Sequence, residues 1–348
     1  MAITAGPRPV TIPSDPPQRR TFRWVRFWAA IGIAHFVLVG WIAFRWFTSG
    51  DLHASPTGPD DAPTHVLAAV YTGQVLSPLV GAGIVYVWLI RPWIRERRLT
   101  TEGMVLIGAL CLYFPYDITN DYVSFLFQYN AHFWNVGSWA GEIPGSIIPR
   151  GHNVVEAPIF MFPAYAWGVF LPMLWGSKFM GYLRKKRPEM GNFGLIAWTL
   201  GLCCVFDLIG EGTVVALQIE SYYGSQHDLS FFGGTIHQFP VYETLFIGLL
   251  YVGGAALLFF RDDKGRTFLE KGVETVRHGS KQLAIIGFLV VVEFLGFMVP
   301  INVMAMHVDS FPKDAKSYML QGVCGPGTPY DCPQHNAPLP RKGGHPDD

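Results

Sequence analysis

The sequence predicts an all-α membrane protein, a polytopic bundle of about seven transmembrane helices with its N-terminus inside and its C-terminus outside. Half of the 348 residues are hydrophobic and only 15% are charged, whereas soluble domains carry about 25% charged residues. The apolar residues come in blocks long enough to cross about 30 Å of hydrocarbon, which takes about 20 helical residues. Basic residues gather in alternate connections between these blocks.

Seven apolar blocks are long enough to be spans. They cover residues 24–47, 66–90, 103–128, 157–182, 193–219, 239–260 and 282–307. The first 20 residues are polar and Pro-rich and lack the apolar core of a cleavable signal peptide. We therefore expect a disordered cytoplasmic tail over 1–22, a transmembrane domain over 23–308 and an extracytoplasmic Pro/Gly-rich tail over 309–348.

The orientation follows from the excess of Lys and Arg that cytoplasmic loops carry. Segments 50–65 and 220–238 contain no basic residue, and 129–156 contains only Arg150. The remaining connections are rich in Lys and Arg. These residues are Arg19, Arg20, Arg23 and Arg26 before the first block, Arg91, Arg95, Arg97 and Arg98 after the second, Arg184, Lys185, Lys186 and Arg187 after the fourth, and Arg261, Lys264, Arg266, Lys271 and Arg277 after the sixth.

The third predicted span carries acids where a lipid-facing helix has none. Residues 116–121 read YDITND. Ionisable groups within a span are costly, so they face the bundle interior or a wet cavity. Positions i, i+3 and i+4 of an α-helix share a face, so Asp117, Asn120 and Asp121 are expected on one polar stripe. A structural role, with tyrosines and waters as partners, is the alternative for these acids.

Three further spans contribute carboxylates. The fifth contains FDLIGEG, with Asp207 and Glu211 four residues apart, Glu243 opens the sixth, and Glu293 lies near the middle of the seventh. Counting 1.5 Å per residue places most of these acids in one outer layer that has few basic residues. Weak acids held partly protonated in an apolar pocket are suited to general acid catalysis. The alternatives are a structural pair in the fifth span, a solvated helix end for Glu243, and a packing polar group for Glu293.

The two long outer connections, 129–156 and 220–238, are rich in aromatic residues and glycine. Their Gly and Pro residues favour folded loops that cover the acids. A histidine alone specifies little, so ordinary surface or packing roles are the alternative for the loop histidines. The residues expected to contact a substrate are Asn120, Trp134, Trp139, Glu142, His152, His237, Tyr242, Glu243 and Glu293.

The C-terminal tail contains the sequence GVCGPGTPYDCPQ. Two cysteines eight apart in a translocated segment indicate a disulfide between Cys324 and Cys332. His335 is near, but two cysteines and one histidine do not make a zinc site. Cys111, Cys203 and Cys204 lie within predicted spans and are expected to be buried free thiols.

Several classes of protein lack their signatures in this chain. A prenyltransferase needs basic residues for a diphosphate, and the outer layer has few. His-Glu-x-x-His, a phosphate loop and Gly-x-Ser-x-Gly are missing. The predicted spans also contain few histidines that could serve as axial ligands of a haem. The zero net charge gives no indication of nucleic-acid binding. A transporter or a seven-helix receptor stays open, although no internal repeat supports a common transporter fold.

The chain resembles the AveC-type spirocyclase family of actinobacterial membrane proteins. The stretches that carry the resemblance are YDITNDYVSFLFQYNAHFWNVGSWAGEIPG, FDLIGEGTVVALQIESYYG, FFGGTIHQFPVYE and FFRDDKGRTFLEKGVE. The resemblance implies a membrane enzyme that closes two hydroxyls of a polyketide-like chain onto a ketone, with loss of water, to give a spiroketal. It also implies that some members dehydrate an alcohol. The resemblance does not indicate which residues are catalytic.

The residues and the resemblance together predict a cofactor-independent cyclase of the bacterial cytoplasmic membrane. Asp117 and Asp121 are expected to act as acid and base, facing Asp207 and Glu211, and no metal is expected. The expected partners are a lipophilic small molecule and the lipid bilayer. The alternatives are a membrane terpene cyclase and a non-enzymatic protein that binds or transports lipids or small molecules.

Overall fold

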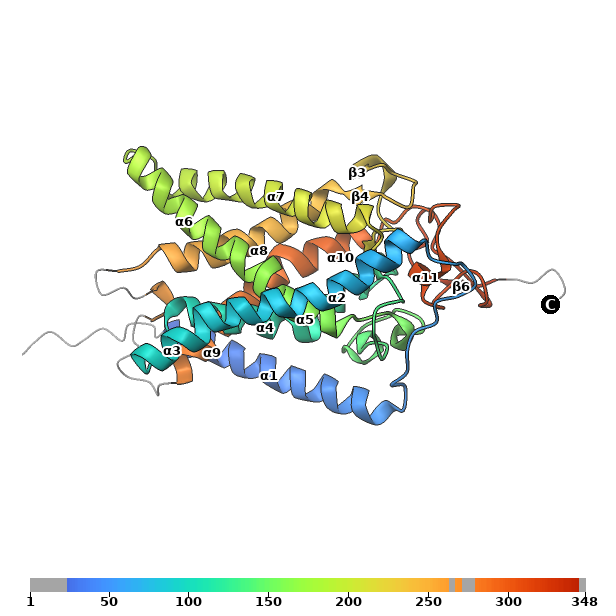
Figure 1. Cartoon of the computed structure of the whole chain (residues 1–348), viewed down its shortest axis with the longest axis horizontal. Helices are drawn as coiled ribbons and strands as arrows, with labels where there is room; N and C mark the ends of the chain where they lie inside the picture. The colour runs from blue at the N-terminus through green and yellow to red at the C-terminus, as the bar shows by residue number, and fades with distance from the viewer. Residues whose placement is uncertain (1–23, 263–266, 271–278, 344–348) are drawn as a thin grey trace, which may run out of the picture.

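The computed structural model describes residues 24–262, 267–270 and 279–343. The predicted N-terminal tail, the final residues of the C-terminal tail and part of the basic loop after the sixth span lie outside the described residues. The described part is a bundle of long helices that run along one axis, with most of the loops gathered at one end (Figure 1). The predicted all-α membrane bundle is therefore confirmed.

Six helical segments of the described chain are long and apolar enough to cross a membrane. Three of them contain a π-helical turn, and each of these turns is followed after one residue by a proline, at Pro92, Pro172 and Pro300. The segments are α1 (Trp24–Ser49), α2–η1–α3 (Thr64–Val85, Tyr86–Ile90 and Arg91–Glu96), α5–η5–α6 (Pro158–Ala164, Tyr165–Phe170 and Leu171–Lys186), α7 (Asn192–Ala216), α8 (Val241–Phe259), and α9–η9–α10 (Gly279–Glu293, Phe294–Met298 and Val299–Ala305).

The third predicted span differs from the other six. Helix α4 (Thr101–Tyr116) has only 16 residues and contains non-helical backbone angles at Phe114, immediately before Pro115. A residue that precedes proline is disfavoured in the α conformation. The chain continues as the 3-10 helix η2 (Asp117–Asp121) and then as an irregular loop. Seven spans therefore stays a prediction, because α4 is too short to be counted among the six.

Helix packing places α4 inside the bundle, where most of its side chains are buried. Helix α4 packs against α9, α9 packs against α1, and α8 packs against both α6 and α7. The α1–α9 contact is especially close, because a Cβ at Gly32 or Gly287 would collide with a backbone carbonyl of the facing helix. Small residues allow this approach in membranes, where packing replaces the hydrophobic effect as the driving force.

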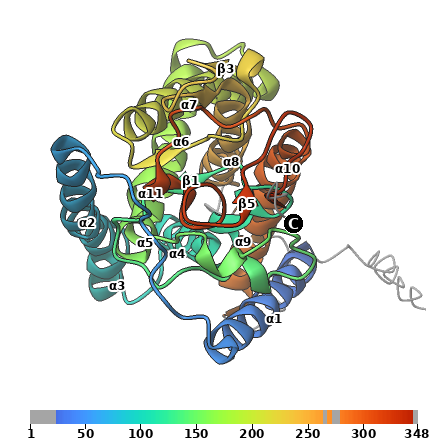
Figure 2. The same ribbon diagram turned by 90° about the vertical axis from the view of Figure 1, so that its right-hand side faces the viewer.

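The loop end is held by short structural elements from distant parts of the chain (Figure 2). The strands are β1 (Gln128–Tyr129) with β2 (Glu220–Ser221), β3 (Ser230–Phe231) with β4 (Phe239–Pro240), and β5 (Tyr330–Asp331) with β6 (Arg341–Lys342), all antiparallel. The short helices are η3 (Ala140–Glu142), η4 (Gly151–Asn153), η6 (His227–Leu229) and α11 (Ser317–Leu320), while η7 (Phe268–Glu270) follows α8. The β1–β2 pair joins the two long outer loops to each other.

The C-terminal segment lies across the middle of this end (Figure 2). The backbone oxygen of Tyr318 accepts a hydrogen bond from Ala131 N at 2.9 Å. The Gln321 side chain donates to Tyr129 O at 2.5 Å and accepts from Val155 N at 2.8 Å. A disulfide joins Cys324 to Cys332. The predicted Pro/Gly-rich tail is therefore folded onto the outer loops over its described residues.

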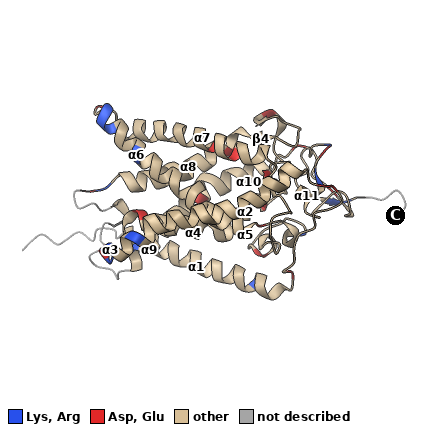
Figure 3. Ribbon diagram, in the orientation of Figure 1, with Lys and Arg blue, Asp and Glu red and all other residues tan. Residues whose placement is uncertain are grey.

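Charged side chains are distributed unevenly along the bundle axis (Figure 3). Basic residues mark α3 and the α6–α7 turn, at the end opposite the long loops. Acidic residues occur within the bundle, including along α7. This distribution agrees with the positive-inside bias used for the orientation, and the orientation itself stays a prediction.

Candidate functional site

The candidate site is a cavity of about 160 Å³ inside the bundle, next to the loop end. We call it the acidic cavity. Six carboxyl or carboxamide side chains line it, together with tyrosines and apolar residues, and its wall contains no Lys, Arg or His among the described residues. Its polar lining consists of Asp117, Asn120, Asp207, Glu211, Glu220 and Glu293 with Tyr116, Tyr129, Tyr165, Tyr222 and Tyr251.

Asp117 forms the first wall of the acidic cavity, at the start of η2. Tyr165 donates to its Oδ1 and Tyr129 donates to its Oδ2, both at 2.9 Å. Both tyrosines are buried. Glu156 lies in the loop before α5, and burial, followed by the charge of Asp117 and a hydrogen bond with it, raises the pKa of Glu156 well above its ordinary value. Asp117 and Glu156 therefore form a carboxyl pair that can hold a proton between them.

The local helix type decides which of the YDITND side chains reach the cavity. In a 3-10 helix, residues i and i+3 are eclipsed, and Asp117 and Asn120 both line the cavity. Asp121 is one position further on and points elsewhere. Its Oδ1 accepts from Leu126 N at 2.8 Å and from Phe127 N at 2.9 Å. The expected single stripe was wrong in this respect, because it assumed α-helical geometry through Asp121.

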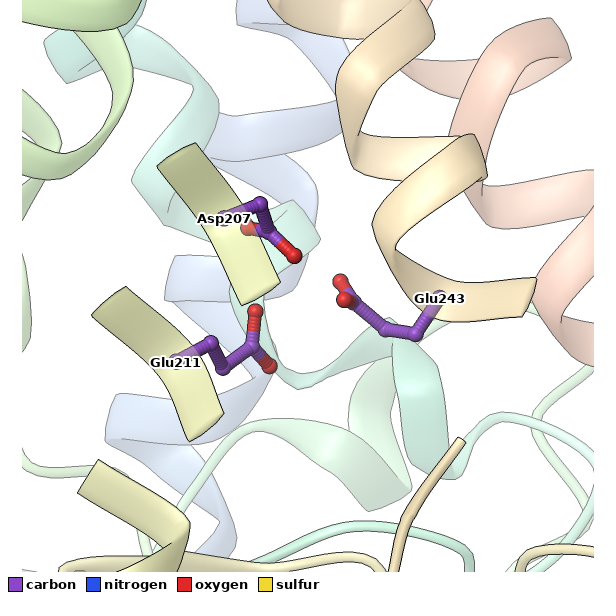
Figure 4. A group of neighbouring side chains, drawn as sticks. All are labelled: Asp207, Glu211 and Glu243. Atoms are coloured by element: carbon purple, nitrogen blue, oxygen red, sulfur yellow. The ribbon is translucent and has the colours of Figure 1, made fainter. Parts of the chain in front are cut away.

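The second wall is formed by α7 and α8. Asp207 and Glu211 point from α7 toward Glu243, which lies in the first turn of α8 (Figure 4). One oxygen from each of the three carboxyls lies within 4.8 Å of the other two. Tyr251 donates to Asp207 Oδ1 at 3.4 Å, and the Tyr222 hydroxyl makes a close contact with Glu211 Oε1. The structure thus brings together three of the acids that were predicted from separate spans.

Two more carboxylates complete the cavity. Glu293 ends α9 and Glu220 lies in β2, and both are buried. One oxygen of each has no hydrogen-bond partner among the described residues. Burial, followed by the charges of Asp117 and Asp207, raises the pKa of Glu220 well above its ordinary value. Glu220 therefore experiences the electrostatic field of both walls.

Comparison with known proteins identifies the family. The family model described as spirocyclase AveC-like matches residues 96–318, nearly two thirds of the chain. The chain belongs to the AveC-like spirocyclase family. Comparison with curated proteins and with solved structures gave no significant match. The resemblance derived from the sequence is confirmed, and the matched range contains every acid that lines the cavity.

The predicted loop residues of this AveC-like protein lie outside the acidic cavity. Trp139 is buried, and its Nε1 donates to Pro115 O at 2.9 Å. Its ring packs on Phe114 with a centroid distance of 4.3 Å. Trp139 thus packs against the interruption of helix α4 that precedes Asp117, without lining the cavity. Trp134 is 55% exposed, and neither tryptophan is among the residues that line the cavity.

The other four predicted contacts are also placed elsewhere. Glu142 forms an ion pair with Arg45 on α1, with a nitrogen–oxygen distance of 2.6 Å. His152 is half-buried beside the ring of His53. His237 is exposed, and Tyr242 packs on Phe246 with its ring outside the cavity lining. A role for these residues at the substrate site stays a prediction that their positions do not support.

Sequence reasoning missed Glu156, Glu220 and the tyrosines that donate to the acids. Both glutamates come from the outer loops, which the β1–β2 pair folds back over the bundle. The cost of burying carboxylates without cations was a usable signal, because buried carboxylates need hydrogen-bond donors. Tyr129, Tyr165 and Tyr222 supply such donors to this AveC-like protein. The acids are thus hydrogen-bonded to tyrosine hydroxyls rather than paired with cations.

Proposed function

We propose that the protein is a membrane-embedded spirocyclase that converts a lipophilic dihydroxy-ketone into a spiroketal with loss of one water. The observation that carries the proposal is the acidic cavity of an AveC-like chain, where Asp117 lies opposite Asp207 and Glu211 with tyrosine hydroxyls as donors. We further propose that it acts in the bacterial cytoplasmic membrane on a polyketide-like substrate. Its family membership and its apolar helices support this proposal.

The chemistry needs a proton donor and a proton acceptor on one small cavity wall. In the first step, one substrate hydroxyl adds to the ketone carbon, its proton goes to a base, and the carbonyl oxygen takes a proton to give a hemiketal. In the second step, the hemiketal oxygen takes another proton and leaves as water. The second hydroxyl then adds to the same carbon and releases its proton. No oxidant or reductant enters this balance.

Asp117 and Glu156 are suited to donate and accept those protons. They share a buried position, and Tyr129 and Tyr165 orient Asp117 from two directions. General acid–base catalysis by one positioned side chain contributes roughly 10²- to 10⁴-fold. Water loss passes through an oxocarbenium-like cation, which nearby carboxylates and aromatic faces stabilise. The walls around Asp207 and Glu220 are placed to supply that field.

A second cavity supports a lipophilic substrate. It measures about 470 Å³ and lies between α1, η2 and the η9–α10 segment. Its lining is largely apolar, with Leu38, Phe294 and Val303 among its residues. Tyr116 lines both cavities and accepts or donates a hydrogen bond with His35 Nδ1 at 3.1 Å. An alkyl chain that enters from the bilayer can occupy this second cavity while its polar part reaches the acids.

The same apolar cavity favours a second candidate function, binding or transport of a lipid without chemistry. The two functions are distinguished by the metabolites of a strain that lacks the gene. The cyclase predicts accumulation of a compound one water heavier than a product of the wild-type strain. Unchanged polyketide and lipid profiles would contradict the cyclase. A changed distribution of one lipid, with no dehydrated product missing, would favour the binding protein.

A further inference from the structure

The three carboxyls of Asp207, Glu211 and Glu243 converge on one point. Each offers an oxygen within 4.8 Å of the oxygens of the other two, and Figure 4 shows all three side chains directed at the same gap between α7 and α8. Oxygens bound to one cation are separated by at most twice the metal–oxygen distance. That limit is about 4.2 Å for Mg²⁺ and about 4.8 Å for Ca²⁺. The bound of 4.8 Å on the three separations therefore matches the Ca²⁺ limit.

The hydrogen bonds around this group leave oxygens without partners. Tyr251 and Tyr222 donate to one oxygen each of Asp207 and Glu211. Asp207 Oδ2 and Glu243 Oε2 have no hydrogen-bond donor among the described residues. Both residues are buried, with exposed fractions of 3% for Asp207 and 1% for Glu243. Buried carboxylate oxygens without partners are costly. The tyrosine donors thus leave one oxygen of Asp207 and one of Glu243 without a partner.

Glu220 gives a second indication, from a separate structural element. It comes from β2 rather than from either helix, is 5% exposed, and lines the acidic cavity beside Asp207 and Glu211. Its Oε1 has no hydrogen-bond partner among the described residues. An unpartnered, buried carboxylate aimed into the cavity next to three others concentrates negative charge where no Lys, Arg or His of the described lining offsets it.

Burying such charge without compensation costs several kcal/mol per ion, so either protons or a cation must occupy the group. Protons satisfy carboxyls in pairs, as at Asp117 and Glu156. A convergence of three oxygens, with a fourth carboxylate nearby, is the arrangement that oxygen-preferring cations use. Glu243 lies in the first turn of α8.

We propose that Asp207, Glu211 and Glu243 bind one hard divalent cation of the Mg²⁺, Mn²⁺ or Ca²⁺ class, with Glu220 as an outer carboxylate. The assignment replaces the metal-free pocket expected from the sequence on this wall only. It bears on the proposed cyclisation only through the charge of this wall, because the proton transfers are assigned to Asp117, on the other wall, and to its partner Glu156.

The test is a Mn²⁺ titration of the purified full-length protein in detergent, followed by the electron paramagnetic resonance signal of free Mn²⁺. The proposal predicts about one saturable site per chain, with competition by Mg²⁺ or Ca²⁺. Glu243→Gln is expected to weaken binding by about tenfold or more, since site affinity depends on ligand charge. Glu96→Gln, which removes an exposed carboxylate paired with Arg98 at the other end of the bundle, serves as the matched control.

Two results would overturn the proposal. One is a wild-type protein that shows no saturable Mn²⁺ binding, and the other is a folded Glu243→Gln variant that binds as tightly as the wild type. If Glu243→Gln does not fold, Asp207→Asn replaces it in the same titration. The midpoint of thermal unfolding provides a second measurement, because a ligand that binds only the folded state raises it. Neither measurement uses a substrate, so failure of the cyclase proposal would leave both results interpretable.

Discussion

Tyr129 and Glu220 are register partners in the β1–β2 pair, and both side chains line the acidic cavity. The first residue follows α4 and η2, and the second follows α7. Their pairing fixes the two outer loops to each other directly above the acids. The hydroxyl of Tyr129 then reaches Asp117, while Glu220 faces the wall formed by α7. One short ladder thus positions a donor and an acid side by side in the lining of the same cavity.

Tyr165→Phe is expected to lower the rate of cyclisation by about 10- to 100-fold, the effect of losing one hydrogen bond to a charged group. The phenyl ring keeps the packing, so the unfolding temperature should change little. The measurement is product formation per amount of folded protein in isolated membranes. A variant with wild-type turnover would remove Tyr165 from the proton network.

Asp121→Ala is expected to act on stability rather than on chemistry. It leaves Leu126 N and Phe127 N without their acceptor, and losing the partner of a buried donor costs about 1–3 kcal/mol. Thermal unfolding of the purified protein should therefore occur at lower temperature, whereas Asp121→Asn, which retains one acceptor oxygen, should lose less. Equal unfolding temperatures for wild type and Asp121→Ala would contradict this role.

The contact between Asp60 and the C-terminal segment should depend on pH. Asp60 accepts from Ser317 N at 2.7 Å, and this hydrogen bond lowers the pKa of Asp60 below its ordinary value of 3.8. A carboxylate whose pKa is lower in the folded state stabilises the fold above its unfolded pKa. That stabilisation is lost as the pH falls through the folded pKa, below 3.8. Pepsin cleavage within 308–343 should therefore increase at the acid end of that range.

Asp60→Asn is the control for this pH effect. Its amide cannot ionise, so cleavage of the C-terminal segment should already be raised at pH 5 and should change less on acidification. Wild-type cleavage that is independent of pH, or that matches the variant at every pH, would show that the Asp60–Ser317 contact does not hold the segment.

The predicted orientation is tested by labelling single cysteines in intact cells, in a background without Cys111, Cys203 and Cys204. Lys313→Cys, in the C-terminal segment, should react with a membrane-impermeant maleimide. Glu189→Cys, in the exposed α6–α7 turn, should react only after permeabilisation. The reverse pattern would place the loops and the acidic cavity on the cytoplasmic side.

Much of the fold could be predicted from the sequence, because membrane spans are determined by local composition. Six of the predicted blocks coincide with long apolar helices. The third did not, since Pro115 changes the helix type just before Asp117 and thereby rotates Asp121 away from the cavity. Periodicity assumes one helix geometry throughout, and a single proline was enough to invalidate it here.

The candidate site could be predicted only in part, for a different physical reason. The acids on helices could be recognised because an ionisable side chain within an apolar span is energetically costly. Glu156 and Glu220 lie in polar loops, where a carboxylate costs nothing until pairing between distant segments buries it. The β1–β2 register and the contacts of Gln321 are such non-local pairings, and no local pattern in the sequence indicates them.

The most direct test of the account compares metabolites in a strain that lacks the gene and is complemented with wild type, Asp117→Asn or Asp121→Asn. The proposed roles predict that wild type and Asp121→Asn restore the spiroketal. Asp117→Asn should leave its precursor, one water heavier, accumulated, although the protein is present in the membrane in similar amount. Full restoration of the spiroketal by Asp117→Asn would contradict the central claim that the acidic cavity carries out the cyclisation.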